Sequence, residues 1–297
     1  MKDYIDSPFY SIKNNKLLYL DSYEICELPK EEKIRKRLLI DEGAMLEKKY
    51  IPQQKKSALI IEPHPDDFAL SALGYTLNQY NAIICNIFTK TDINNFPWIR
   101  YIDITENQYE KLRIEESILS IEKLLNQRFI TMAKESLRIT NEKHDSLKKQ
   151  ILALTKRILE ENNVDTLLVP MGIGKHPDHL IAHNSIMDDK NITKNVKIIL
   201  YPEYPYSRSK KDYFDRINEL ESWYNLNKII INIDEDKMNI IANAISAYRS
   251  QFDDINRQQM LAIIREDYRS IAQENNQIQE TMVLYEFIGE KNENKFF

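Results

Sequence analysis

From residue 57 onward, apolar runs of strand length alternate with segments of helical periodicity, and this alternation most constrains the fold. A repeated strand–helix order is typical of a mainly parallel sheet with helices on both faces. We therefore predict an α/β protein with a Rossmann-like layered fold, whose last strand is an edge strand or a late addition. The expected strands are 57–62, 83–88, 129–132, 165–169, 196–201, 228–233 and 281–287, and the expected helices are 68–79, 106–125, 143–162, 179–187, 235–250 and 256–272.

The first 56 residues lack this alternation. Loosely alternating segments around Asn14-Asn15 favour short strands or a hairpin, and the charged stretch 31–49 favours a helix. We interpret residues 1–56 as an N-terminal extension packed on the core, residues 57–290 as one main domain, and residues 291–297 as a frayed polar tail.

Two polar clusters each follow an expected strand. The first is His64-Pro65-Asp66-Asp67 and the second is His176-Pro177-Asp178-His179, and four of the five histidines in the chain lie in or beside them. Imidazole and carboxylate groups are the ligands of a catalytic zinc ion, which takes three protein groups and leaves one position for water. One His and one Asp from the first cluster with one His from the second would complete such a set. A further carboxylate and a further His would then remain for proton transfer.

Composition excludes several other classes of protein. The formal net charge is −5 and no long basic run occurs, so we expect no nucleic-acid partner. No apolar stretch reaches about 18 residues, so we expect no membrane span. Two cysteines outside any CxxC pair and the absence of an apolar signal region favour a cytoplasmic protein. With 5 Gly and no Gly-x-Gly-x-x-Gly, a dinucleotide cofactor is not expected. The sequence is compatible with a homo-oligomer and does not determine one.

The two clusters together resemble the signature pair of the PIG-L/LmbE-like family, which are zinc-dependent N-deacetylases of N-acetylglucosamine-type substrates. The paired motifs in this order are far more specific than either tetrapeptide alone. The resemblance extends over about residues 57–252 through three further segments in the same order, namely Ser71-Ala72-Leu73-Gly74, Arg113-Ile114-Glu115-Glu116 and Tyr248-Arg249-Ser250-Gln251.

The resemblance implies a metal-dependent amide hydrolase. His64, Asp67 and His179 match the family's metal ligands, for Zn²⁺ or another divalent metal. Asp66 matches the general base that deprotonates the metal-bound water. The implied reaction is attack of zinc hydroxide on the acetamide of a small acetamido-sugar conjugate, which yields a free amine and acetate.

Three more residues receive roles from the same resemblance. His176 matches the residue that stabilises the oxyanion and donates a proton to the departing amine, and Asp178 would orient His176. Arg113 is a candidate substrate contact, with a helix-surface ion pair as the equal alternative.

Two positions depart from the family pattern. Phe68 stands where many members carry Glu, and the loop that begins Thr89-Lys90-Thr91-Asp92 lacks the usual glycine. Neither departure removes a chemical role, although the loop lies where substrate would approach. The aromatic run 201–206 is either a set of packed tyrosines or a wall that faces a sugar.

Three other functional alternatives remain open from sequence. A phosphoesterase would need a second metal about 4 Å from the first, with more ligands than the sequence offers. Hydrolysis of another acyl amide or ester fits the same site. A non-catalytic binding protein would have no reason to keep both Asp66 and His176.

Overall fold

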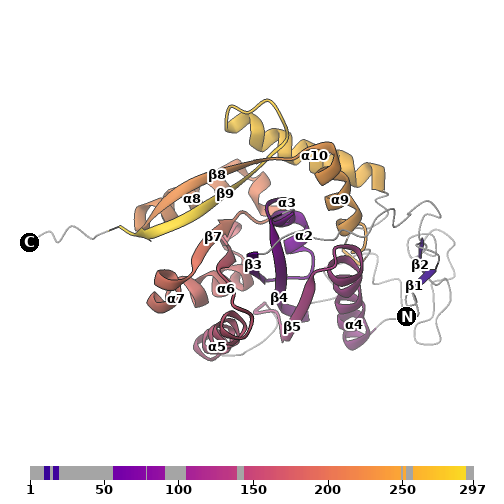
Figure 1. Cartoon of the computed structure of the whole chain (residues 1–297), viewed down its shortest axis with the longest axis horizontal. Coiled ribbons are helices and arrows are strands. Elements are labelled where there is room, and N and C mark those ends of the chain that lie inside the picture. The colour runs from indigo at the N-terminus through magenta and orange to yellow at the C-terminus, as the bar shows by residue number, and fades with distance from the viewer. Residues whose placement is uncertain are drawn as a thin grey trace, which may run out of the picture.

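The computed structural model of the chain describes residues 10–13, 16–19, 56–77, 79–90, 105–138, 144–248, 250–251 and 257–291. At its centre lies a seven-stranded sheet (Figure 1). Its strands are β3 (Lys56–Glu62), β4 (Tyr80–Lys90), β5 (Arg128–Glu135), β6 (Thr166–Pro170), β7 (Lys197–Tyr201), β8 (Tyr224–Asn232) and β9 (Thr281–Glu290). They are arranged in the order β5-β4-β3-β6-β7-β9-β8. The first five strands of this order are parallel, and β9 runs antiparallel to both of its neighbours.

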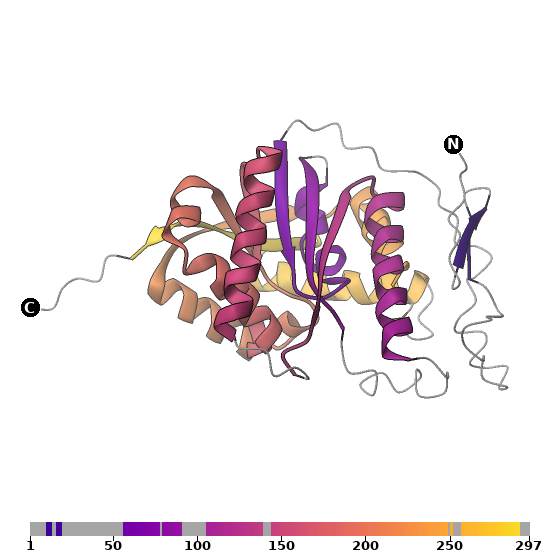
Figure 2. The same ribbon diagram turned by 90° about the horizontal axis from the view of Figure 1, so that it is seen from below.

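Helices cover both faces of the sheet (Figures 1 and 2). They are α2 (Asp67–Ser71), α3 (Leu73–Thr76), α4 (Glu106–Ser117), α5 (His144–Asn162), α6 (Pro177–Met187), α7 (Lys190–Asn195), α8 (Lys210–Trp223), α9 (Glu235–Ile245) and α10 (Arg257–Glu274). Helix α4 continues as a π-helical segment, η3 (Ile118–Leu124), and two 3₁₀ turns are η4 (Ile173–Lys175) and η5 (Tyr206–Arg208). Helix α9 packs on α2, α3, η3 and α10, whereas α6 packs on α5 and α7. None of the described helices combines the length and the apolar character that crossing a membrane requires.

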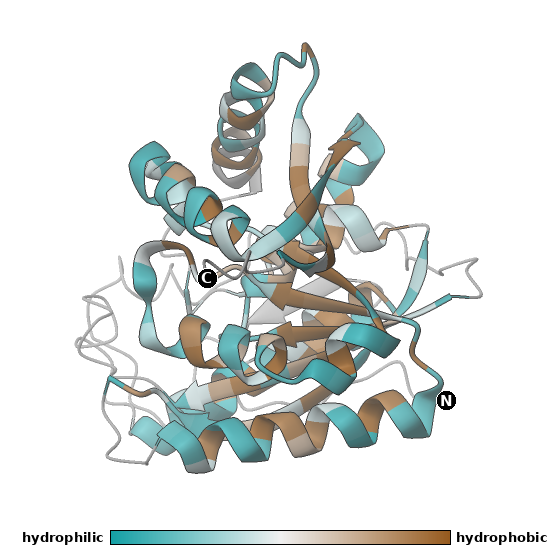
Figure 3. Cartoon of the chain, turned by 90° about the vertical axis from the view of Figure 1, so that its left-hand side faces the viewer, coloured by the Kyte–Doolittle hydropathy of each residue, from teal (hydrophilic) through white to brown (hydrophobic). Residues whose placement is uncertain are grey.

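The core lies along the central strands. Leu59, Ile60 and Ile61 of β3 are fully buried, as are all apolar residues of β6. A strand covered by helices on both faces has no solvent-facing side, so its sequence is apolar throughout instead of alternating. Figure 3 shows the result as hydrophobic strands enclosed by helices with polar outer faces.

The strand order reverses between β3 and β6. From β3 the chain proceeds to β4 and β5, and it then crosses back to place β6 on the other side of β3. The connections that leave the carboxyl ends of β3 and β6 therefore diverge, which leaves a crevice where open α/β sheets bind ligands. Both histidine–aspartate motifs follow these two strands.

The predicted fold class is confirmed. Strands β1 (Tyr10–Lys13) and β2 (Lys16–Tyr19) pair antiparallel, which confirms the predicted hairpin at Asn14-Asn15. The last strand, β9, lies inside the sheet, and β8 forms the edge beside it. The expected helix 68–79 is two short helices, because the backbone leaves helical geometry at Ala72. The remainder of the predicted extension and the tail 292–297 lie outside the described residues.

A buried carboxylate joins two distant segments that the sequence marked. Glu116 in α4 is fully buried, and its carboxylate accepts hydrogen bonds from Ser250 N at 2.8 Å and Ser250 Oγ at 2.5 Å. The neighbouring Gln251 donates through Nε2 to Tyr109 Oη at 2.9 Å. These contacts fasten α4, which carries Arg113, to the segment after α9. A buried carboxylate of this kind is stable only while its hydrogen bonds are made.

We expect Ser250→Ala to lower the free energy of unfolding by about 1–3 kcal/mol, because it removes the hydroxyl donor of a buried carboxylate. Urea denaturation followed by circular dichroism measures the change. Ser222→Ala is the matched control, since the exposed Ser222 hydroxyl only donates to Glu219 O in its own helix. We expect that control to change stability by less than about 0.5 kcal/mol. Equal stability of the two variants would show that Glu116 does not depend on Ser250.

Candidate metal centre

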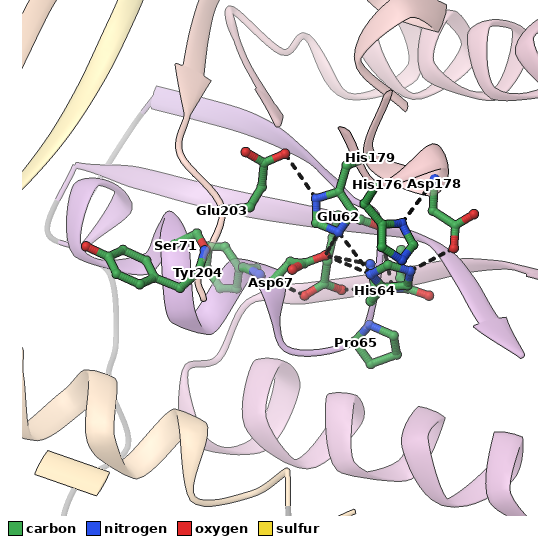
Figure 4. A network of polar contacts seen from close by, with 12 residues as sticks. Glu62, His64, Pro65, Asp67, Ser71, His176, Asp178, His179, Glu203 and Tyr204 are labelled. Carbon is green, nitrogen blue, oxygen red and sulfur yellow. Dashed lines mark hydrogen bonds and ion pairs between the residues drawn. The ribbon is translucent and has the colours of Figure 1, made fainter. Parts of the chain in front are cut away.

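Three side chains from the two motifs converge at the sheet crevice (Figure 4). His64 lies in the turn after β3, Asp67 is the first residue of α2, and His179 lies in the first turn of α6. His64 Nδ1 lies 3.0 Å from His179 Nε2. Asp67 Oδ2 lies 3.6 Å from His64 Nδ1 and 3.5 Å from His179 Nε2. The three atoms thus form a nearly equilateral triangle.

This triangle fits a tetrahedral zinc ion. Bonds of about 2.0–2.1 Å to nitrogen and oxygen in tetrahedral geometry place neighbouring ligand atoms about 3.3 Å apart. The observed edges of 3.0, 3.5 and 3.6 Å bracket that separation. The residues predicted as ligands are therefore brought together with the spacing that the metal requires.

His176 is a fourth group beside the triangle. Ring nitrogens of His64, His176 and His179 all lie within 4.8 Å of one another, so three histidines are a second conceivable ligand set. We favour Asp67 as the third ligand because its Oδ2 lies 3.6 Å from His64 Nδ1 and 3.5 Å from His179 Nε2, which is close to the spacing of neighbouring zinc ligands. Asp67 Oδ2 also accepts a hydrogen bond from His64 N at 2.7 Å, which holds it in place.

The prediction that the Asp178 carboxylate orients His176 is wrong, because this carboxylate binds His64 instead. Asp178 Oδ2 accepts from His64 Nε2 at 2.8 Å, and Oδ1 accepts from Leu137 N at 2.7 Å. Only the backbone of Asp178 touches His176, whose Nδ1 accepts from Asp178 N at 3.2 Å. Helix α6 begins at Pro177, so Asp178 projects toward the neighbouring strand end, where it meets His64.

Asp178 thereby fixes the tautomer of His64. A proton on Nε2, held by a fully buried carboxylate, leaves the Nδ1 lone pair facing the triangle. Pairing of a ligating histidine with a carboxylate in this way orients the ring and raises its basicity.

Glu203 fixes the tautomer of His179 in the same way as Asp178 fixes that of His64. The sequence analysis did not predict this role of Glu203. His179 Nδ1 donates to Glu203 Oε1 at 3.0 Å, so its Nε2 lone pair faces the triangle. Glu203 is fully buried two residues beyond β7, and its Oε1 also accepts from Gly172 N at 2.6 Å. The available signal was its position just after a third strand in the sheet, next to β6.

His176 is held as a neutral hydrogen-bond donor. Its Nδ1 accepts a backbone hydrogen bond, so the proton lies on Nε2. Burial, with the neighbouring His64 and His179, lowers the pKa of His176 to about 3. The ring is therefore uncharged at neutral pH and presents Nε2–H to the site.

Asp66 differs from the other motif carboxylates. Burial and the adjacent negative charge of Asp67 raise the pKa of Asp66 well above its usual range, and the Arg113 guanidinium acts in the opposite direction. No hydrogen bond joins its side chain to another described residue. Its backbone has φ 103°, a left-handed conformation that a non-glycine residue rarely adopts. Such strain is often found where a side chain is held for chemistry.

Arg113 lies beside this turn and is only 3% exposed. It donates to Thr89 O at 3.4 Å and to Pro65 O at 3.5 Å, and its Nε has no partner among the described residues. A surface ion pair is therefore excluded as its main role, and contact with substrate stays a prediction.

The aromatic run 201–206 divides between core and site. Tyr201 is buried and donates to Ile61 O at 2.6 Å, and Tyr204 is buried against Tyr268. Tyr206 alone reaches the site, with its ring centroid 5.8 Å from that of His176 and 5.2 Å from that of His179.

The fold is shared by several solved structures, three of which follow. The zinc-inhibited form of teicoplanin deacetylase is 15% identical with a TM-score of 0.62, covering 80% of this chain and 100% of that one. An N,N'-diacetylchitobiose deacetylase from Pyrococcus horikoshii is 18% identical with a TM-score of 0.52, covering 78% and 83%. A 4-carboxy-2-hydroxymuconate hydratase from Pseudomonas putida is 11% identical with a TM-score of 0.54, covering 78% and 96%.

At these sequence identities the structural similarity shows the fold alone. The proteins that share this fold include a hydratase as well as deacetylases. No curated protein sequence matches the chain. Residues 59–188 match the family of GlcNAc-PI de-N-acetylases, PIG-L, and this segment contains both histidine–aspartate motifs. The segment that carries both motifs is therefore similar to the PIG-L family.

Proposed function

We propose that the protein is a metal-dependent hydrolase that removes the N-acetyl group from an N-acetylglucosamine-type small-molecule conjugate. The observation that carries the proposal is the triangle of His64, Asp67 and His179, with edges of 3.0 to 3.6 Å. Two groups of the same motifs have no hydrogen-bond partner among the described residues, namely the Nε2–H of His176 and the carboxylate of Asp66. The triangle supplies a metal site, the Asp66 carboxylate supplies a base, and His176 Nε2–H supplies a hydrogen-bond donor for the oxyanion.

Bound at the triangle, zinc or another divalent cation would lower the pKa of a water molecule and polarise an amide carbonyl. Asp66 takes a proton from the attacking water as the general base. His176 donates through Nε2–H to the carbonyl oxygen as negative charge develops there. The C–N bond then breaks, and we propose that the amine takes its proton from Asp66. This differs from the sequence expectation that His176 donates the proton, because the neutral His176 is a poor acid.

The substrate class is proposed from relatives together with the family. One structural neighbour is named for diacetylchitobiose, an acetamido sugar, and another for teicoplanin. The ring of Tyr206 beside His176 and His179 offers a flat apolar surface that suits a pyranose. A cytoplasmic location and a homo-oligomer stay predictions.

The phosphoesterase alternative is less well supported. Among the described residues, one group of His, Cys, Asp and Glu side chains lies close enough together to hold a metal. A two-metal site would need more ligands about 4 Å away. The hydratase neighbour shows only that the same fold serves another reaction.

The proposal is tested by metal content and amine release. We expect about one metal ion per chain, and release of free amine from N-acetylglucosamine derivatives that stops with a chelator and returns when zinc is added. Elemental analysis and a fluorogenic amine assay measure the two quantities. A protein that binds no metal after reconstitution would contradict the proposal. Bound metal with no amine release would contradict the proposed deacetylase activity, whereas the proposed metal site would stand.

Substitution of the two adjacent motif aspartates is expected to distinguish metal binding from turnover. Asp66→Ala should keep the metal and lower kcat by about 10²–10⁴-fold, because it removes the general base without touching the triangle. Asp67→Ala should lose the metal first, since it removes one vertex. Isothermal titration with zinc and steady-state kinetics compare the two variants. Full kcat in Asp66→Ala would show that another group is the base.

Glu203→Gln should weaken zinc affinity by about 10–100-fold, because it removes the negative charge that holds the Nδ1 proton of His179. Competition against a zinc-binding dye measures the affinity. Glu219→Gln is the control, because Glu219 pairs with Arg216 and not with a ligand. Similar zinc affinities in the two variants would rule out this role for Glu203.

A further inference from the structure

Glu62, the last residue of β3, is a fully buried carboxyl that the proposed chemistry does not use. Figure 4 shows it beside the motif side chains. Its Oε1 accepts a hydrogen bond from Phe68 N at 3.0 Å, and its Oε2 accepts from Asn86 Nδ2 at 3.2 Å. Glu62 thus bridges the turn that carries His64 and Asp66, from the end of β3 to the start of α2.

The partner at Oε1 is an amide that needs a cap. Helix α2 begins at Asp67, so Phe68 N is one of the first amides, which have no carbonyl partner within the helix. An aspartate at the preceding position ordinarily accepts this hydrogen bond with its own side chain. Asp66 occupies that position and makes no such bond.

The backbone of Asp66 explains why. Capping residues ordinarily have extended backbone geometry, whereas Asp66 has φ 103° and ψ −27°. In this left-handed conformation the Asp66 side chain makes no hydrogen bond to the first amides of α2. The amide of Phe68 would then be buried without a partner, at considerable cost, were Glu62 not there to accept its hydrogen bond.

We propose that Glu62 is a positioning residue that caps α2 in place of Asp66 and so leaves the Asp66 carboxylate free to act as the base. This inference rests on the proposed function for the role of Asp66. The capping contact itself stands on geometry alone. Without an acceptor at position 62, relaxation of Asp66 to ordinary capping geometry relieves the strained φ and satisfies Phe68 N. That relaxation removes its carboxylate from catalysis.

Glu62→Met and Glu62→Gln test the proposal in the zinc-loaded full chain. Met fills most of the buried volume and has no acceptor. Gln keeps an oxygen for Phe68 N, and Asn86 can turn its own amide to face the new N–H₂. Asp234→Ala is the matched control, because Asp234 caps α9 by accepting from Lys237 N at 2.9 Å and belongs to neither motif.

We expect Glu62→Met to keep its zinc and its KM and to lose kcat by about 5–30-fold, the factor that a cap of about 1–2 kcal/mol implies. Glu62→Gln should recover kcat to within about threefold of the wild type. Asp234→Ala should lose thermal stability with unchanged kcat. Loss of zinc in Glu62→Met, or failure of Gln to rescue kcat, would overturn the proposal.

The double variant Asp66→Ala with Glu62→Met shows whether Glu62 acts through Asp66. Two residues that act as one unit are non-additive, so we expect the double variant to have the kcat of Asp66→Ala alone. A further drop of fivefold or more would assign Glu62 an independent role and overturn the inference.

A crystal structure of Glu62→Met gives a readout that needs no turnover. We expect an Asp66 carboxylate oxygen within about 3.2 Å of an amide in the first turn of α2. An unchanged Asp66 would overturn the proposal. A wild type without deacetylation would instead contradict the proposed function, and the structure would still decide the capping.

Discussion

The site depends on three acceptor atoms that face one another within 3.6 Å. Two imidazole lone pairs and a carboxylate oxygen at that distance repel unless a positive charge lies between them. In a buried environment the repulsion is stronger than in water. The surrounding contacts hold the three atoms against it. Asp178 and Glu203 each bind the outer ring nitrogen of one histidine, and His64 N binds the Asp67 carboxylate.

Strand topology makes this arrangement attainable. Strands β3, β6 and β7 are neighbours in the parallel part of the sheet, so their carboxyl ends open on the same edge. The three strand ends supply the first motif, the second motif and Glu203. His64 is therefore held by a carboxylate 114 residues away in sequence, and His179 by one 24 residues away.

Sequence alone predicted the sheet, its parallel strands and the convergence of the two motifs, because strand–helix alternation and polar groups after strands are local patterns. The partner of Asp178 could not be predicted, since the choice between His64 and His176 depends on how α6 meets the end of β3. Glu203 stands alone in a run of Tyr and Pro, and although it follows a strand, no second polar group beside it marks it as part of a site. The position of β9 inside the sheet likewise depends on pairing with β7 and β8, which periodicity does not encode.

The buried carboxyl groups divide into two kinds. Glu62, Glu116 and Glu203 are each fully buried, and each accepts a hydrogen bond from a backbone amide of a different segment, at Phe68, Ser250 and Gly172. An amide donor offsets the cost of burying a carboxyl group and at the same time fixes the backbone at that point. Asp66 receives no such bond from any described residue. Asp67 and Asp178 likewise accept backbone hydrogen bonds, from His64 N and Leu137 N, so Asp66 is the exception among the motif carboxylates. The hydrogen bond from Phe68 N to Glu62 thus both holds the turn between β3 and α2 and leaves the Asp66 carboxylate available as the base.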